Sequence, residues 1–248
     1  SSASTEPIDK DNTGQRLYAG AHVAIRFTLF APIDNLLHSN NIVELGCGTG
    51  CFGLITALNS DVKSLLLTDG TDNTLSIAHM NKRHLLPDSK NVIIQKLMWG
   101  DSEQVSRVIK EYNGDLPYDV VIGCELMYYL TDIPLLLSTA LQLTNYQGLF
   151  IHAHLFRRAG QEDELIESLR DVGWNTLEVL IRDFIPIEEL SQHPAWYNMR
   201  ALISGPQDRI ASLLAENPSW IVFQPTPPAN SHDNDEELEE GALHSLFP

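Results

Sequence analysis

The chain has 248 residues, 43% of them hydrophobic, which is enough to build one domain with a full core. Its formal net charge of −17 gives a surface that repels nucleic-acid phosphate, so we expect no nucleic-acid partner and favour a basic protein. An acidic surface kept for solubility is the alternative. No hydrophobic run approaches the roughly twenty residues of a membrane helix, and the polar N-terminus is unlike a signal peptide, so we expect no membrane association.

The two ends of the chain differ from its middle. Residues 1–40 form an N-terminal segment whose apolar pattern over 16–38 predicts a helical cap. The main domain is predicted to span 41–224. A proline-rich stretch then opens an acidic tail, 225–248, whose composition predicts disorder.

Between these ends, strand and helix patterns alternate from residue 42 to about 184. This alternation predicts an α/β fold, a parallel sheet with helices on both faces. The expected strands are 42–46, 64–69, 91–96, 118–123 and 148–154, and the expected helices are 51–59, 72–85, 102–112, 132–144 and 160–172. Residues 174–184 are interpreted as a sixth strand, and the seventh is either 196–204 or 219–224.

The first strand runs into a glycine-rich turn that contains Gly46, Gly48, Gly50 and Gly53. Glycine permits unusual backbone angles and carries no side chain, so a ligand can approach the backbone and the N-terminus of the following helix. The spacing fits neither a dinucleotide loop nor a phosphate loop, which would need a Gly-Lys-Ser/Thr ending. Asp69 ends the second strand about twenty residues later, where an acid can hydrogen-bond a ribose diol.

The pattern from Glu44 to Gly50, followed by Asp69, resembles motif I of the seven-strand, Rossmann-like class I S-adenosylmethionine-dependent methyltransferases. The resemblance implies strand order 3-2-1-4-5-7-6 with strand 7 antiparallel. Such sheets bind ligands at the carboxyl ends of their strands, where the strand order reverses. The cofactor-binding residues that we expect there are Glu44, Gly46, Cys47, Gly48, Gly50, Asp69, Trp99 and Cys124.

Three of these residues have specific expected roles. Glu44 ends an apolar strand, where a carboxylate needs a partner such as the methionine ammonium of the cofactor; capping of the loop is the alternative. Asp69 is expected to bind the ribose hydroxyls, with helix capping as the alternative. Trp99 is expected to form a wall beside the adenine, with a core tryptophan as the alternative, and Asp101 is available to the adenine amino group.

The residues at the end of the fourth strand indicate the class of substrate. It lacks the Asn/Asp-Pro-Pro-Tyr/Phe motif of many methyltransferases that act on nucleic-acid bases. Glu125-x-x-Tyr128 instead resembles the Asp/Glu-x-x-Tyr/Phe motif of the methyltransferase-16-like family, most of whose characterised members modify lysine. Supporting matches are Leu97-x-Trp99-Gly100, Leu67-Thr68-Asp69 and Phe156-Arg157-Arg158.

This resemblance implies a methyltransferase that uses S-adenosylmethionine, releases S-adenosylhomocysteine and acts on a protein nitrogen, most of all lysine. Glu125 would orient the lysine and Tyr128 would form a wall beside it. The alternatives are a small-molecule methyltransferase and a non-catalytic cofactor-binding scaffold. We expect a monomer, no metal site, and a cytoplasmic or also nuclear location, since three cysteines indicate a reducing compartment.

Overall fold

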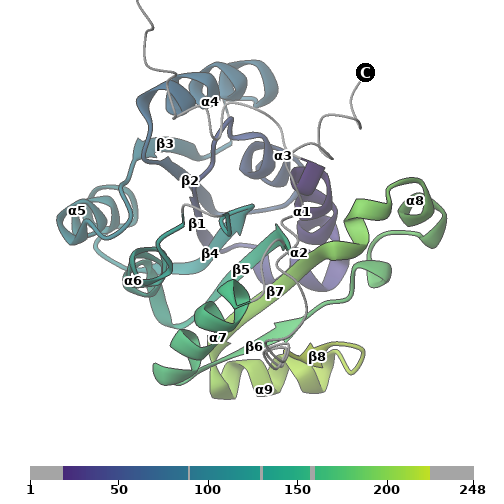
Figure 1. The fold of residues 1–248 in the computed structure, drawn as a ribbon. Helices are drawn as coiled ribbons and strands as arrows, with labels where there is room; N and C mark the ends of the chain where they lie inside the picture. Colours follow the sequence, from purple (N-terminus) through teal and green to yellow (C-terminus); the bar gives the residue numbers. More distant parts are fainter. Residues whose placement is uncertain (1–18, 89, 129–130, 157–159, 224–248) are drawn as a thin grey trace, which may run out of the picture.

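The computed structural model describes residues 19–88, 90–128, 131–156 and 160–223. Helices and strands alternate through most of this part of the chain, as the sequence predicts (Figure 1). The strands are β1 (Asn41–Leu45), β2 (Ser64–Asp69), β3 (Val92–Lys96), β4 (Tyr118–Cys124), β5 (Thr144–Leu155), β6 (Trp174–Glu178), β7 (Met199–Pro206) and β8 (Ile221–Val222). The α-helices are α1 (Ala19–Leu29), α2 (Ala31–Leu37), α3 (Cys51–Asn59), α4 (Asp72–Leu85), α5 (Ser102–Tyr112), α6 (Ile133–Leu143), α7 (Gln161–Asp171), α8 (Ile187–Gln192) and α9 (Gln207–Glu216). Two short 3₁₀ helices are η1 (Ile181–Asp183) and η2 (Pro194–Asn198).

The strands form one sheet in the order β3-β2-β1-β4-β5-β7-β6-β8. β3, β2, β1, β4 and β5 pair in parallel, and β7 pairs antiparallel with both β5 and β6. The Rossmann-like fold class and the order 3-2-1-4-5-7-6 are therefore confirmed. The described sheet has eight strands rather than seven, because β8 adds to β6 at the edge.

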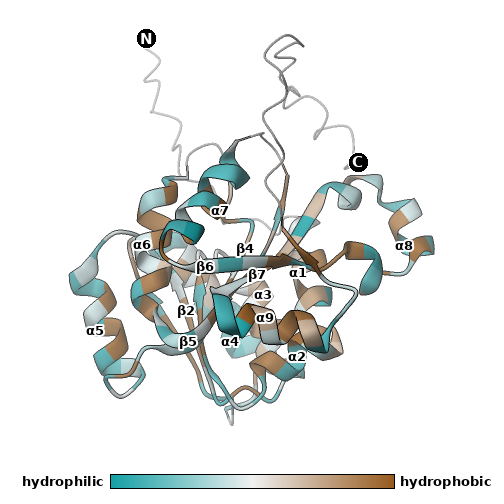
Figure 2. Cartoon of the chain, turned by 90° about the horizontal axis from the view of Figure 1, so that it is seen from below, coloured by the Kyte–Doolittle hydropathy of each residue, from teal (hydrophilic) through white to brown (hydrophobic). Residues whose placement is uncertain are grey.

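Two hydrophobic layers enclose the sheet. One face packs against α1, α2, α3, α4 and α9, and the other packs against α5, α6 and α7. Strands buried on both faces need apolar side chains in both directions, which explains the apolar stretches 42–43 in β1 and 65–67 in β2. The helices carry both hydrophobic and hydrophilic stretches, as expected when one side faces the sheet (Figure 2).

Local signals fix the helix starts beside the carboxyl edge of the sheet. Asp101 caps α5 by accepting a hydrogen bond from the amide of Gln104, and Asp132 caps α6 by accepting one from Leu135. The N-cap of α3 is Gly50 in a left-handed conformation with φ of 75°. Because β1 to β4 pair in parallel, the loops that follow them all lie at one edge of the sheet.

The predicted sixth strand over 174–184 is wrong beyond residue 178. β6 ends at Glu178, and the chain then forms η1, α8 and η2 before β7. Phe184 leaves the sheet to pack against α1 and its end, with ring centroids 5.3 Å from Phe27 and 6.1 Å from Phe30. Both candidates for the seventh strand contain strand structure, in β7 and in β8.

The predicted helical pattern over 16–38 corresponds to α1 and α2 within the described residues. α1 packs against α3, β5 and β7, so it covers the sheet near the carboxyl end of β5 (Figure 1). The division into segments at 40 and 224 stays a prediction, and the tail at 225–248 lies outside the described residues.

Candidate functional site

The glycine loop between β1 and α3 presents bare backbone. Gly46, Gly48 and Gly50 have φ angles of 59°, 53° and 75°, a left-handed conformation in which side chains are strained. At Gly46 an ideal Cβ would lie 2.9 Å from the side chain of Leu126 and 3.3 Å from the ring of Trp99. The ends of β1, β3 and β4 therefore meet at this glycine, as the fold prediction requires.

Glu44 lies beneath the loop and is almost fully buried, with 1% of its surface exposed. Burial raises the pKa of its carboxyl well above the ordinary value; a backbone hydrogen bond from Gly53 opposes this, and the charge of Asp69 adds to it. Glu44 Oε2 has no hydrogen-bond partner among the described residues. A buried, unpaired carboxylate oxygen is costly, so this atom fits a cationic ligand group.

Asp69 joins the glycine loop to the start of α4. Its Oδ2 accepts a hydrogen bond from the amide of Gly48 at 3.0 Å, and its Oδ1 accepts from the amide of Thr71 at 3.0 Å and the hydroxyl of Thr74 at 2.8 Å. The carboxylate therefore fixes the local loop and helix start. Each carboxylate oxygen has two lone pairs, so Oδ2 keeps one for a ribose hydroxyl.

Trp99 follows β3 and is half-buried, with its ring against Gly46 and the hydrophobic layer of α5 and α6. Trp99 therefore makes a core contact and borders the glycine loop, and its expected place beside the adenine stays a prediction. Asp101 is different. Its two carboxylate oxygens accept hydrogen bonds from the amide and the side chain of Gln104, at 2.9 and 2.5 Å, which makes it a helix cap.

The cysteines at this edge differ in exposure. Burial raises the pKa of the Cys47 thiol well above its ordinary value, and the charges of Glu44 and Asp69 raise it further. Burial and the charge of Glu44 also raise the pKa of the half-buried Cys51. Cys47 can offer its backbone to a ligand, but its thiol is buried and largely protonated, while Cys124 is half-buried at the end of β4.

Glu125 and Tyr128 lie just beyond β4. Glu125 has a left-handed φ of 57°, which is uncommon for a residue other than glycine. Its amide donates to the carbonyl of Ala153 at 2.8 Å, and its Oε1 accepts from the amide of Leu155 at 3.2 Å. Its carboxylate also lies against Gly20 of α1, where an ideal Cβ would be 1.8 Å from Oε1. This carboxylate is therefore fixed between β5 and α1.

The sequence interpretation missed three residues that support the acceptor motif. Gly20 leaves room for the Glu125 carboxylate, as its contact shows. Thr131 Oγ1 accepts from the amide of Tyr128 at 3.1 Å and donates to the carbonyl of Leu126. Gln161 Nε2 donates to the carbonyl of Tyr128 at 2.8 Å. In the sequence, Gly20 stands out as a glycine inside a helical pattern. Thr131 and Gln161 have no comparable signal in the sequence. Arg157 and Arg158 lie outside the described residues.

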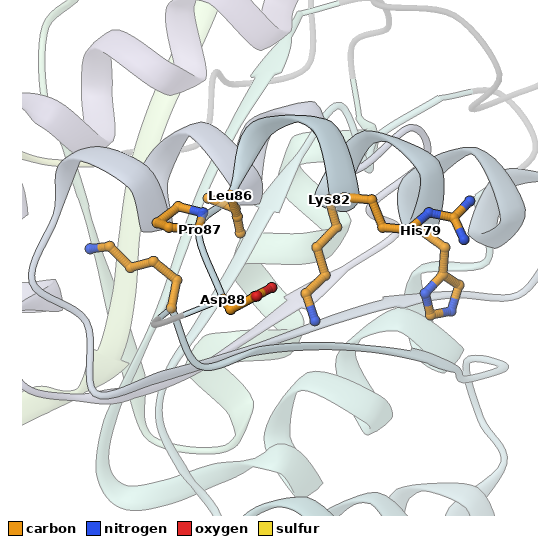
Figure 3. A pocket seen from close by; sticks show the side chains of 7 residues that line it. His79, Lys82, Leu86, Pro87 and Asp88 are labelled. Carbon is orange, nitrogen blue, oxygen red and sulfur yellow. The ribbon is translucent and has the colours of Figure 1, made fainter.

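A separate pocket of about 300 Å³ lies at the C-terminal end of α4, lined by His79, Lys82, Arg83, Leu86, Pro87, Asp88 and Lys90 (Figure 3). α4 starts beside the carboxyl end of β2 and its C-terminal end precedes the start of β3, so this pocket is at the opposite edge of the sheet. The amines of Lys82 and Lys90 donate to the carbonyls of Val92 and Ser60. It is therefore not the cofactor site.

A family model described as lysine methyltransferase matches residues 8–171. The chain belongs to the lysine methyltransferase family. The match includes β1 to β5 and extends to the end of α7, so it contains every candidate site residue.

Curated relatives of this lysine methyltransferase-family chain include protein N-lysine methyltransferase METTL21A of Xenopus tropicalis, which is 28% identical over 131 residues, 52% of this chain and 55% of the relative. Protein-lysine N-methyltransferase EFM3 of Chaetomium thermophilum is 28% identical over 142 residues, 56% of this chain and 41% of the relative. EEF1A lysine methyltransferase 3 of Mus musculus is 26% identical over 201 residues, 74% of this chain and 80% of the relative. The chain spans about half the length of the first two.

Solved structures share the fold. Magnesium protoporphyrin IX methyltransferase of Synechocystis, with bound S-adenosylmethionine, has a TM-score of 0.52 and 16% identity over 75% of this chain and 80% of its own. The [4+2]-cyclase SpnF has a TM-score of 0.51 and 16% identity over 79% of this chain and 85% of its own. The second is named a cyclase, so the fold alone does not assign methyl transfer.

The described residues contain neither a membrane-spanning helix nor a metal-binding cluster. None of the helices there is long and apolar enough to cross a membrane. In the same residues, no group of three or more histidine, cysteine, aspartate or glutamate side chains is arranged to hold a metal ion.

Proposed function

We propose that this chain transfers a methyl group from S-adenosylmethionine to the side-chain nitrogen of a lysine in a protein, with S-adenosylhomocysteine as product. Membership of the lysine methyltransferase family supports the reaction class. The observation that carries the choice of acceptor is the fixed carboxylate of Glu125, which stands just beyond β4 and next to the edge that contains the glycine loop.

Several residues would hold the cofactor. The unpaired oxygen of Glu44 suits its ammonium, Asp69 Oδ2 suits a ribose hydroxyl, and Trp99 offers a flat apolar face beside Gly46. The remaining candidate contacts are Cys47, Gly48, Gly50 and Cys124. When bound, S-adenosylmethionine supplies a methyl group activated by a positively charged sulfur.

Glu125 and Tyr128 would act on the acceptor. A lysine has a pKa of about 10.4 in water, so only about one part in a thousand is neutral near pH 7.4, at a cost of about 4 kcal/mol. Glu125 attracts and orients the incoming ammonium, and a partly dehydrated site lowers the cost of losing its proton. Tyr128 forms a wall beside the nitrogen. The rate gain then comes mainly from alignment of the lone pair with the methyl group.

We further propose that the substrate is a basic protein rather than a nucleic acid. The net charge of −17 supports this choice because it attracts a basic surface and repels phosphate. We propose that the chain acts as a monomer in the cytoplasm, with the nucleus as an additional location. Its low cysteine content supports a reducing compartment.

The test is transfer of tritiated methyl groups from S-adenosylmethionine into a cell extract, with Asp69→Ala as the comparison. We expect label in a discrete protein band with the wild-type chain and a loss of about ten-fold or more with the variant. Label only in small molecules would favour a small-molecule methyltransferase. Cofactor binding without any transfer would favour a scaffold.

A further inference from the structure

A network of charged and polar groups, built on the buried pair His154–Glu162, lies at the carboxyl end of β5, outside the cofactor loop. His154 Nε2 lies 2.7 Å from Glu162 Oε1, and these two side chains are only 1% and 6% exposed. Glu162 Oε2 lies 3.7 Å from Arg200 Nε, and Arg200 Nη1 donates to Glu178 Oε1 at 2.9 Å. The guanidinium carbon of Arg200 is 5.7 Å from the ring centroid of Phe156. The network therefore joins α7 to β5, β7 and β6.

The buried pair His154–Glu162 is costly to keep out of water. Charged groups lose their hydration on burial, and apolar residues of similar volume often stabilise a core as well or better. His152 adds to the cost, because it stacks between Phe150 and His154 with centroids 4.6 and 5.3 Å apart and its Nε2 has no partner among the described residues. Burial lowers the pKa of His152, and His154 lowers it further. Packing alone does not explain why histidine and glutamate side chains are buried here.

The first turn of α7 connects this network to the acceptor motif. Gln161 donates to the carbonyl of Tyr128 at 2.8 Å, and its neighbour Glu162 binds His154. On the other side, the amide of Leu155, the residue after His154, donates to Glu125 Oε1. Both residues of the acceptor motif are therefore held by segments that the His154–Glu162 pair ties together.

We propose that Glu162 is a positioning residue that acts through His154: it fixes the first turn of α7 against β5, so that Gln161 holds Tyr128 and Leu155 holds Glu125. This role rests on the proposed lysine methyl transfer for its catalytic consequence. Its structural consequence, a fixed acceptor loop, is independent of the reaction.

The variants separate positioning from general stability. Glu162→Ala removes the bond to His154, whereas Glu162→Gln keeps an acceptor oxygen for His154 Nε2–H and loses the charge facing Arg200. Glu164→Ala is the matched control, because Glu164 is an exposed acid in the same turn of α7. Gln161→Ala removes the bond to Tyr128 and leaves the His154–Glu162 pair intact, so it tests the hold on the acceptor loop if Glu162→Ala does not fold.

The experiment measures amide hydrogen exchange of cofactor-loaded protein, together with the initial rate of tritiated methyl transfer into extract and the affinity for S-adenosylmethionine. We expect Glu162→Ala and Gln161→Ala to speed exchange over residues 125–128 and slow transfer, each by about ten-fold or more. Exchange over 41–71 and cofactor affinity should stay at wild-type values. Glu162→Gln should recover most of both losses, and Glu164→Ala should behave as wild type.

The two proposals fail in different ways. If no variant and no wild-type protein transfers methyl groups, the proposed function fails, but exchange over 125–128 still tests the positioning role. Wild-type exchange over 125–128 in a folded Glu162→Ala would overturn the positioning role, and so would wild-type exchange in Gln161→Ala if Glu162→Ala does not fold. A uniform increase across the whole chain without rescue by Glu162→Gln would also overturn it.

Discussion

The carboxylate of Glu44 fills the space that a side chain on residue 53 would need: an ideal Cβ at Gly53 would lie 2.1 Å from Glu44 Oε2 and 2.4 Å from the side chain of Leu67. Gly53, the last glycine of the loop motif, therefore leaves room for the buried Glu44 and does not form a turn.

Gly53→Ala should therefore damage the cofactor site. The added methyl group displaces Glu44 and overpacks the start of α3, which should cost about 1–3 kcal/mol of stability. We expect affinity for S-adenosylmethionine, measured by calorimetry, to fall about ten-fold or more. Leu58→Ala, at an exposed position of the same helix, is the control and should bind normally. Normal binding by Gly53→Ala would show that Glu44 can move freely.

Glu44→Gln should stabilise the cofactor-free protein at neutral pH while weakening cofactor binding. Burial raises the pKa of Glu44 above its ordinary value of 4.5, so the folded state prefers the protonated carboxyl and loses stability as pH rises from that value through the raised one. Glutamine has no carboxyl group to ionise, so the variant does not lose stability in this way. Thermal unfolding should show a Tm higher by about 2–6 °C at pH 7.5, with the difference shrinking as pH approaches 4.5. A lower Tm at every pH would contradict the expectation.

Asp69→Ala should destabilise the glycine loop as well as weaken cofactor binding. The substitution removes three hydrogen bonds, from Gly48, Thr71 and Thr74, at an expected cost of about 1–3 kcal/mol in urea unfolding. Asp72→Ala is the control: the side chain of Asp72 is exposed and pairs with Lys96, so its loss should change stability by about 0.5 kcal/mol or less. Equal stabilities of the two variants would argue that Asp69 does not hold the loop.

Gly20→Ala should separate methyl transfer from cofactor binding. An ideal Cβ would lie 1.8 Å from Glu125 Oε1, so the carboxylate must leave its place against Leu155. We expect the transfer rate to fall by about ten- to a hundred-fold while cofactor affinity stays unchanged. Leu29→Ala, an exposed position on the same helix, should retain full transfer. An unchanged rate in Gly20→Ala would mean that the position of Glu125 is not needed.

Most of the fold could be predicted from local pattern. Strands buried on both faces contain short apolar stretches, and the expected bounds of β1, β2 and α3 agree with the structure to within one residue. The expectation failed at 179–184, where Phe184 packs against Phe27 of α1. That contact joins segments far apart in sequence, so no local period reveals it.

The candidate site also contains residues that local sequence predicts and residues that it does not. Glu44, Asp69 and the glycine loop follow from the register of a β-α-β unit, and the structure brings them together. Gly20 supports Glu125 and Gln161 supports Tyr128, although both are far from the acceptor motif in the sequence. Their partners are set by how α1 and α7 dock, which the local sequence does not state.

The identity of the methylated atom is the most direct test of lysine methyl transfer. Protein labelled by the purified chain and tritiated S-adenosylmethionine would be isolated and hydrolysed, and its amino acids separated. We expect all of the label in methyl-lysine, with none after reaction with Glu125→Ala. Label in methyl-histidine or methyl-arginine, or no labelled protein at all, would contradict it.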